Sequence, residues 1–300
     1  ISNLHLKSCW VQIGAQFKAT NFKTHACGCI RCDCFQFLNV GSRQEELIRL
    51  ELQHKVWLSE AKHGWDLAEF KTGQTILDLG CGPGYCTEEL AHIVGKTGKV
   101  IGVDRSDAFI AYLNEIKKLN RLSIEPCLAD FDTLSLNHES LDGMYCRWAL
   151  AWLSNPKEIL AKIKDALKPN GKMVIHEYYN YATHVTKPEK PALKKAIAAA
   201  LKSFKDSDFE IDVGSFLPRY FEELGMKIIN IRLMPKLGTP GSMTWEWPKT
   251  WYHNYFPRLV SMGYLSKQDV KDALGSVLEL EMLPYATLCC PLMVEVIAEK

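Results

Sequence analysis

The chain lacks the sequence features that mark membrane, secreted and nucleic-acid-binding proteins. No apolar run reaches the roughly 20 residues that a membrane-spanning helix needs, and the first residues lack the basic and then apolar pattern of a signal peptide. The 36 basic and 35 acidic residues are scattered and leave a formal net charge of +1. This distribution excludes a basic surface of the kind that binds nucleic acid or an anionic membrane. We therefore expect a cytoplasmic enzyme with small or neutral partners, and a homodimer is compatible with the sequence.

The 11 cysteines are odd in number and unevenly placed. Four crowd into one short segment, at Cys27, Cys29, Cys32 and Cys34. A thiolate metal site is one interpretation of this cluster. Its C-x-C-x2-C-x-C spacing is tighter than the separated C-x2-C pairs of a zinc site, so residues 1–41 are expected to be an appendage without metal. The cysteines of the core are expected to behave as small hydrophobes in a reducing compartment.

A strong alternation of strand and helix patterns begins near residue 73. The length of 300 residues, with 47% hydrophobic and 24% charged, suits one large domain with insertions. A helix is expected at 42–58, followed by strands at 75–79, 99–104, 123–128, 141–147 and 171–178 and by helices at 86–94, 107–119 and 156–167. The alternation predicts an α/β fold, a Rossmann-like three-layer sandwich with helices on both faces of a mostly parallel sheet.

The pattern becomes irregular after residue 180. Helices are expected at 191–204 and 214–224, and strands at 226–233 and 292–298. The core is then residues 71–180 with 212–234 and 287–300, preceded by a helical lid segment at 42–70. The remaining segments, 181–211 and 235–286, predict cap insertions on the substrate side of the sheet.

A glycine-rich turn follows the first strand, in Leu77-Asp78-Leu79-Gly80-Cys81-Gly82-Pro83-Gly84-Tyr85. Glycines allow a tight turn whose backbone N–H groups approach a ligand. A dinucleotide fingerprint requires G-x-G-x-x-G, in which the third glycine permits close packing of helix on strand. Here Gly80 and Gly82 fit, but Tyr85 occupies the third position and Gly84 comes one residue early. The spacing therefore disfavours a pyrophosphate ligand.

Three acids near strand ends indicate a different ligand. Asp104 ends the second strand, where a carboxylate can accept hydrogen bonds from both hydroxyls of a ribose. Asp130 follows the third strand and can accept from an adenine amine, with Phe131 beside it as an apolar face. Asp78 lies next to the turn, where a carboxylate suits a cationic amino group. Each acid alone could merely cap a helix, but the three together describe an adenosine with an amino-acid tail.

These motifs resemble the class I S-adenosylmethionine-dependent methyltransferases, in particular the group related to ubiquinone and menaquinone methyltransferases. The matching segments are Leu77 to Gly84, Gly102-Val103-Asp104-Arg105-Ser106, Ala129-Asp130-Phe131 and Leu167-Lys168-Pro169-Asn170-Gly171. The resemblance implies a seven-stranded sheet with an antiparallel last strand, and S-adenosylmethionine as cofactor, leaving S-adenosylhomocysteine as product. The cysteine-rich segment does not match the family.

The predicted cofactor contacts follow from these motifs and from two further positions. They are Asp78, Gly80, Cys81, Gly82, Gly84, Asp104, Arg105, Ala129, Asp130, Phe131, Arg147 and Gln53. Arg147 ends the fourth strand, where a guanidinium can hold a carboxylate. For Gln53, periodicity alone favours packing of its helix across the sheet over a contact with the ligand.

Methyl transfer from a sulfonium is an in-line displacement that depends mainly on orientation. A general base is needed only when the acceptor holds its proton near neutral pH. His176, Glu177 and Tyr178 end the fifth strand and are the candidate catalytic residues, although alternation along the strand can also place one of them against a helix.

The acceptor is expected to be a small, apolar or aromatic molecule. Its predicted pocket residues are Tyr179, Trp245, Trp247, Trp251 and Tyr252, which can equally form the core of a lid. Cys146-Arg147-Trp148-Ala149 does not match the Asn/Asp-Pro-Pro-aromatic motif of the DNA enzymes that methylate amino groups, so nucleic acid is not expected as substrate. Two alternatives remain open from the sequence: an NAD(P)-dependent oxidoreductase, and a non-catalytic S-adenosylmethionine-binding protein.

Overall fold

A computed structural model describes residues 43–207 and 209–300. The cysteine cluster from Cys27 to Cys34 and the expected appendage of residues 1–41 lie outside these residues. All the described elements belong to one unit, residues 40–300. Among the described residues, no helix combines the length and the apolar character needed to cross a membrane.

A seven-stranded sheet forms the centre of the described chain, in the order β3-β2-β1-β4-β5-β10-β7. Its strands are β1 (Thr75–Leu79), β2 (Lys99–Asp104), β3 (Ile124–Leu128), β4 (Leu141–Arg147), β5 (Leu167–Asn180), β7 (Lys227–Met234) and β10 (Leu292–Glu299). The last strand, β10, runs antiparallel to both of its neighbours. The predicted sandwich with an antiparallel last strand is confirmed.

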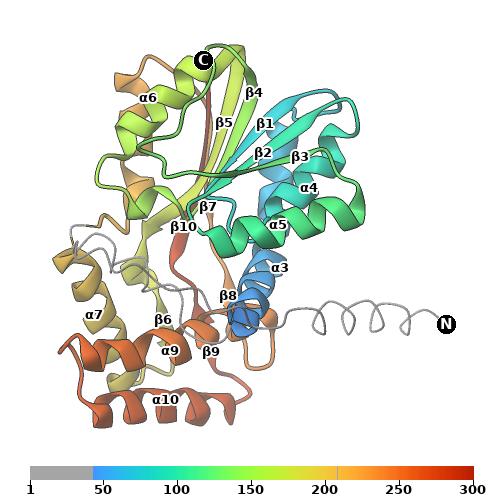
Figure 1. Ribbon diagram of the computed structural model, residues 1–300. Coiled ribbons are helices and arrows are strands. Elements are labelled where there is room, and N and C mark those ends of the chain that lie inside the picture. The colour runs from blue at the N-terminus through green and yellow to red at the C-terminus, as the bar shows by residue number, and fades with distance from the viewer. Residues whose placement is uncertain (1–42, 208) are drawn as a thin grey trace. The chain divides into compact units, whose positions relative to one another are not determined.

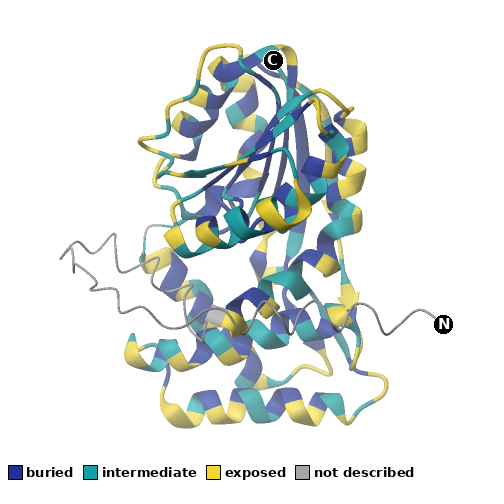
Figure 2. Ribbon diagram, turned by 45° about the vertical axis from the view of Figure 1, so that its right-hand side comes forward, coloured by how far each residue is buried: buried dark blue, intermediate teal, exposed yellow. Residues whose placement is uncertain are grey.

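Helices cover both faces of this sheet. They are α3 (Arg43–Leu67), α4 (Tyr85–Val94), α5 (Asp107–Asn120), α6 (Pro156–Ala166) and α8 (Leu217–Glu223). Apolar residues of α3, α4 and α5 form one buried cluster with the sheet, and those of α6 and α8 belong to the cluster of the other face. The central strands β1, β4 and β10 are buried along most of their length, as Figure 2 shows, whereas the edge strands β3 and β7 are partly exposed.

A second group of elements lies beyond the carboxyl ends of the parallel strands, in the lower half of Figure 1. Its helices are α7 (Pro191–Asp206), α9 (Met243–Ser261) and α10 (Lys267–Glu281). A small antiparallel sheet, β6-β9-β8, joins them through β6 (Val185–Lys187), β8 (Leu237–Gly238) and β9 (Thr287–Cys289). We call these elements the cap.

The element boundaries differ from the sequence-based expectation mainly at α3 and in the cap. The expected helix ended at residue 58, whereas α3 continues to Leu67. Its second half packs on the sheet through Ala61 and Trp65, which are fully buried. Helical cap insertions were expected at 235–286 without bounds for single elements, and the structure has β8, α9 and α10 there.

A buried polar chain connects α3 with four strands of the sheet, β4, β5, β10 and β7. His176 of β5 lies between the Tyr145 hydroxyl, 3.4 Å from Nδ1, and a Glu295 carboxylate oxygen, 2.9 Å from Nε2. The Arg232 guanidinium donates to Glu295 at 3.2 Å and also contacts Glu60 of α3. Since a buried charge is costly unless it is paired, this chain fixes the angle at which α3 crosses the sheet.

Gly64 is the point of closest approach between α3 and that polar chain. A Cβ atom placed on Gly64 would lie 2.9 Å from Val174 Cγ1 and 3.2 Å from His176 Nε2, and nearer still to the Glu295 carboxylate. We expect Gly64→Ala to lower the free energy of unfolding by about 1–3 kcal/mol through overpacking, as measured by urea denaturation.

The matched control is Gly275→Ala in α10, where an added Cβ meets nothing within 4 Å. Alanine there gains helix propensity and should stabilise by roughly 0.5–1 kcal/mol. Equal effects at the two glycines would contradict the close packing of α3 on the sheet.

Candidate functional site

The glycine turn between β1 and α4 contains three residues whose backbone has a positive φ angle. Gly80, Gly82 and Gly84 have φ of 73°, 54° and 94°. A Cβ on Gly80 would lie 2.5 Å from that of Ala149, and one on Gly84 would overlap the Leu113 side chain. At Gly82, by contrast, a Cβ would meet nothing within 4 Å. Gly80 and Gly84 are therefore required by packing, while Gly82 faces open space at the edge of the sheet.

Asp104 connects the end of β2 to this turn. Its Oδ2 accepts a hydrogen bond from the Gly82 N–H at 2.9 Å, and its Oδ1 accepts one from the Ser106 N–H at 2.8 Å. Burial raises the pKa of this carboxyl, while the backbone N–H groups act in the opposite direction. Each carboxylate oxygen keeps a second lone pair, so Asp104 can accept further hydrogen bonds from a ligand at Gly82.

The residues after β3 lie next to Asp104. The Ala129 N–H donates to the Asp104 carbonyl oxygen at 3.1 Å. Asp130 is exposed, with one carboxylate oxygen 4.0 Å from Nη1 of Arg105. The Phe131 ring is half-buried and would lie 3.5 Å from a Cβ on Gly80. The structure thus brings these predicted residues together around Gly82.

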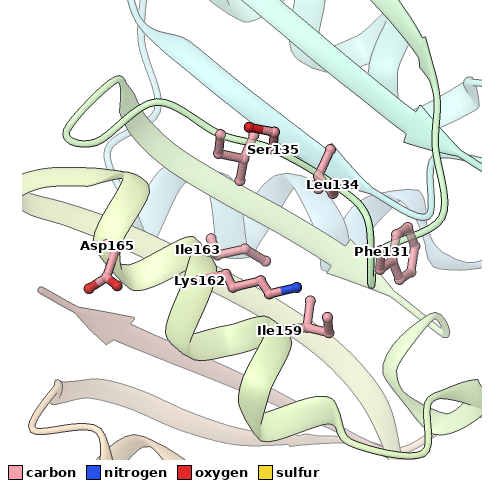
Figure 3. A pocket seen from close by; sticks show the side chains of 8 residues that line it. Phe131, Leu134, Ser135, Ile159, Lys162, Ile163 and Asp165 are labelled. Carbon is pink, nitrogen blue, oxygen red and sulfur yellow. The ribbon is translucent and has the colours of Figure 1, made fainter.

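Phe131 also lines a pocket of about 270 Å³ between the segment after β3 and helix α6. Figure 3 shows the Phe131 ring at one end of it and Lys162 beneath. The Lys162 ammonium donates to the Asp132 carbonyl oxygen at 2.8 Å, which fixes this segment against α6. The pocket is lined by 131, 134–136, 159, 162, 163 and 165, so it adjoins the turn without including the glycines.

Asp78 lies beneath the turn rather than at its surface. The carboxylate is buried and accepts a hydrogen bond from the Thr87 hydroxyl at 2.6 Å. Burial raises its pKa to about 6. The neighbouring Cys81 is also buried, and its N–H donates to the Val103 carbonyl oxygen at 2.9 Å. In this arrangement Asp78 holds α4 against β1, and a contact with a cationic ligand group stays a prediction.

Arg147, at the end of β4, has a buried donor without an acceptor. Its Nη1 has no hydrogen-bond partner among the described residues. The guanidinium carbon lies 5.0 Å from the centre of the Trp148 ring. The pKa of His54 on α3 falls to about 3, chiefly through burial and secondly through the positive charge of Arg147. The site therefore contains a cation suited to an anionic ligand group.

The three candidate catalytic residues at the end of β5 have different surroundings. His176 is fully buried beneath α3 in the polar chain described above. Glu177 is fully buried on the opposite face, where its Oε1 accepts from the Leu150 N–H at 2.8 Å. Tyr178 is half-buried, and its ring lies 5.9 Å from Trp148 and 4.9 Å from Tyr181. Of the three, only Tyr178 contacts aromatic rings that lead to the cap.

Glu177 also has an orphaned oxygen. Its Oε2 is buried without a hydrogen-bond partner among the described residues. Burial raises the pKa of this carboxyl to about 8, against the effect of the N–H groups of residues 149–151. These N–H groups belong to the turn that follows Trp148, whose φ of 56° is unusual for a bulky residue. Glu177 therefore holds the turn that carries Trp148.

Aromatic rings from α3, β4 and α9 meet between the sheet edge and the cap. Trp148 packs against Trp57 and Trp247, with ring centres 5.8 and 5.6 Å away. The chain of rings continues through Tyr181 to Trp251 on the next turn of α9, at 5.9 Å. We call these residues, with Tyr178, the aromatic cluster. It occupies the side of the sheet edge that faces the cap.

Gln53 bridges α3 and the cap. Its Oε1 accepts from the Trp247 indole N–H at 3.0 Å and from Arg49 Nη1 at 3.4 Å. This contact holds Trp247 of the aromatic cluster against α3. A direct contact between Gln53 and the cofactor stays a prediction.

The predicted acceptor residues separate into two groups. Trp247 and Trp251 belong to the aromatic cluster. Trp245 and Tyr252 are fully buried within the cap, where their side chains hydrogen-bond to Glu281 and His184 respectively. Tyr179 is 43% exposed.

Sequence reasoning missed two members of the cluster, Trp57 and Tyr181. The signal for Trp57 was its spacing of four residues from Gln53 on an expected helix, which puts both on one face. Tyr181 gave no such signal. In the described part of the chain, no three His, Cys, Asp or Glu side chains are placed to hold a metal ion.

Comparison with known proteins agrees with this arrangement. A family described as a methyltransferase domain matches residues 70–225. The chain is 35% identical over 100 residues to trans-aconitate 2-methyltransferase of Variovorax paradoxus, covering 33% of this chain and 37% of that protein. It is 27% identical over 150 residues to the ubiquinone/menaquinone biosynthesis C-methyltransferase of Hydrogenovibrio crunogenus, covering 48% and 53%. The matches thus span about a third to a half of these relatives' lengths.

Among solved structures, geranyl diphosphate C-methyltransferase from Streptomyces coelicolor is similar, with a TM-score of 0.53 and 14% identity. The superposition covers 82% of this chain and 77% of that one. At this identity the similarity supports the fold.

The buried Glu177 carboxyl generates a test of stability against pH. Its pKa is raised from 4.5 in the unfolded chain to about 8 in the folded one, so the folded state binds the extra proton. Wild-type stability should therefore fall as pH rises from 5.5 to 8. Glu177→Gln keeps the acceptor for Leu150 without the charge, and should remove up to about 3 kcal/mol of that fall. Urea denaturation at several pH values measures it.

The control for that test is Glu222→Gln, on the surface of α8. This variant should leave the pH dependence unchanged. If Glu177→Gln and wild type lose stability in parallel between pH 5.5 and 8, the carboxyl does not stay protonated in the folded protein.

Proposed function

The chain belongs to the methyltransferase-domain family, as a class I member that uses S-adenosylmethionine, and we propose that it transfers the methyl group to a small, apolar or aromatic acceptor by in-line displacement. The proposal rests on one observation, the set of groups around the open face of Gly82. Asp104 and Asp130 lie on one side of that turn. Arg147 ends the neighbouring strand β4, and its Nη1 donor is unpaired.

The residues fit the parts of S-adenosylmethionine. Asp104 has lone pairs for the ribose hydroxyls, and Asp130 with Phe131 suits the adenine amine and ring. The unpaired Nη1 of Arg147 suits the carboxylate of the methionine part. The bound cofactor supplies a methyl group on a positively charged sulfur. The contribution of the protein is then to position both reactants and exclude water.

The aromatic cluster supports an apolar or aromatic acceptor. Trp148 directly follows β4 and Tyr178 lies near the end of the adjacent strand β5, while Trp247 and Trp251 come from the cap. Rings of this kind favour flat, apolar molecules and keep water away from the reacting atoms. Orientation alone can supply much of the rate of a displacement.

Among the candidate catalytic residues, we propose that Tyr178 orients the acceptor. Burial raises the pKa of its phenol above the usual value. Tyr178 therefore keeps its proton at neutral pH and can donate a hydrogen bond. His176 and Glu177 have structural partners in the sheet and in the Trp148 turn. A role for either as general base remains a prediction for acceptors that must lose a proton.

Tyr85, the residue at the third glycine position of the fingerprint, argues against the NAD(P)-dependent alternative. Tyr85 begins α4, and its hydroxyl donates to the Leu47 carbonyl oxygen of α3 at 3.0 Å. Its side chain fills the space where the dinucleotide fingerprint needs a glycine. The second alternative, binding without turnover, differs only in the outcome of a transfer assay.

Calorimetry with two ligands tests the proposed cofactor contacts. S-adenosylhomocysteine carries the amino-acid carboxylate, and 5′-methylthioadenosine lacks it. Arg147→Met should weaken S-adenosylhomocysteine binding about 10- to 100-fold, since a buried charged contact is worth roughly 1.4–2.8 kcal/mol, and should leave methylthioadenosine unchanged. Asp104→Ala should weaken both ligands.

Arg219→Met is the control for the arginine, because Arg219 lies on the surface of α8 and pairs with Glu223. Binding of NAD in place of S-adenosylhomocysteine would overturn the proposed function. Equal losses for both ligands in Arg147→Met would remove Arg147 from the carboxylate site.

Turnover is tested with methyl-labelled S-adenosylmethionine and a fractionated metabolite extract. We expect label in small molecules that are retained on an aromatic-selective resin, and none in added DNA or RNA. Tight cofactor binding without any transfer would favour the non-catalytic alternative.

A further inference from the structure

A second arginine of the described chain shares the unusual state of Arg147. Arg258 of α9 has two buried guanidinium nitrogens, Nε and Nη1, without a hydrogen-bond partner among the described residues. A guanidinium carries five N–H donors, and burying them unpaired is costly. Neither the sheet nor the cofactor contacts proposed above account for this residue.

Arg258 lies on the face of α9 that carries the aromatic cluster. Trp247, Trp251, Tyr255 and Arg258 follow one another at intervals of four, four and three residues, which places them on one side of a helix. Trp247 and Trp251 contact rings of the sheet edge, and Tyr255 stacks on Trp251 at 5.3 Å. Arg258 thus ends a continuous stripe that begins at the sheet edge.

The opposite side of α9 has a structural role. Trp245 and Tyr252 point into the cap, where they bond to Glu281 and His184. Phe256 and Leu259 are fully buried with them. The helix therefore turns one side into the cap interior and its Trp247 side towards α3. Tyr255 lies between the two sides, because its hydroxyl is 2.8 Å from that of Ser203 on α7 and its ring stacks on Phe204.

The charges around Arg258 do not balance. Glu46 of α3 is buried and is held by Arg49 through two hydrogen bonds of 2.9 and 2.6 Å. Burial and the positive charge of Arg49 lower the pKa of the Arg258 guanidinium, while the negative charge of Glu46 raises it. A guanidinium nevertheless stays a cation at neutral pH. Glu46 is thus paired with Arg49, and the unpaired Nε and Nη1 of Arg258 are left for an anion.

We infer that the methyl acceptor carries an oxyanion, a carboxylate or a phosphate, and that Arg258 binds it at the end of the aromatic stripe. Eleven residues of helix separate Trp247 from Arg258, about 16 Å at 1.5 Å per residue. An acceptor that also reaches Trp148 is then an elongated molecule, whereas a shorter aromatic anion can bind Arg258 at this end of the stripe alone. This inference rests on the proposed function and assigns Arg258 as a residue that determines specificity.

The experiment compares anionic ligands with their neutral counterparts. The probes are indole-3-acetate with indole-3-acetamide, and phenyl phosphate with phenol, so that the two arms distinguish carboxylate from phosphate. Binding is measured by calorimetry and by quenching of tryptophan fluorescence, with and without S-adenosylhomocysteine. We expect at least one anion to bind 10-fold or more tightly than its neutral partner. Arg258→Met should abolish that preference and Arg258→Lys should restore part of it.

Two measurements keep the outcome clear. Arg219→Met, which removes a surface arginine paired with Glu223, should retain the full preference for the anion. Thermal unfolding of each Arg258 variant checks that the cap is folded, and Arg258→Lys serves if the methionine variant is unstable.

The inference is wrong if neither anion is preferred, if Arg258→Met keeps the preference, or if Arg219→Met loses it equally. Failure of the wild-type protein to bind S-adenosylhomocysteine would instead contradict the proposed function. The preference for the anion is measured with and without S-adenosylhomocysteine. Failure of the Arg258 inference can therefore be told apart from failure of the proposed function.

Discussion

The site depends on the parallel pairing of β1 with β2 and β4. In this register Asp78 lies beside Gly102 on one side and Tyr145 on the other. Parallel strands end at the same edge of a sheet. The glycine turn, Asp104 and Arg147 are far apart in the sequence and come together only because these strand ends are adjacent. The contacts proposed for the ribose and the carboxylate follow from that pairing, and the adenine contacts after β3 follow from the pairing of β3 with β2.

Strain at one strand end is held by hydrogen bonds from the next strand. Trp148 has a left-handed backbone, a conformation that costs a bulky residue roughly 1–3 kcal/mol. Its N–H donates to the His176 carbonyl oxygen at 3.2 Å, and the Leu150 N–H donates to the Glu177 carboxylate. Thus His176 and Glu177 of β5 contribute to the site by placing the Trp148 ring. Residues at the end of a strand can serve a site without contacting its ligand.

Much of the core could be predicted from sequence because its signals are local. Apolar runs of five to seven residues, separated by helical periods, gave the strands from β1 to β4 within one residue of their observed bounds. The turn and the acid after β2 were found because a glycine pattern and a strand end are visible in one short window. The roles at the end of β5 were not visible, since whether His176 and Glu177 face a helix or a ligand depends on α3 and on the Trp148 turn.

The cap shows why aromatic content alone does not identify an acceptor site. The aromatic positions of α9 occur at 245, 247, 251, 252, 255 and 256, which spread without a gap over about half of the circumference of a helix. Sequence therefore cannot say which ring faces the cap interior. The structure separates them by partners, because Trp245 and Tyr252 bond to groups within the cap. Trp247 bonds instead to Gln53 of α3. A helix with two apolar faces needs two cores, and the second core of α9 is the aromatic cluster at the sheet edge, next to the site where the methyl donor is proposed to bind.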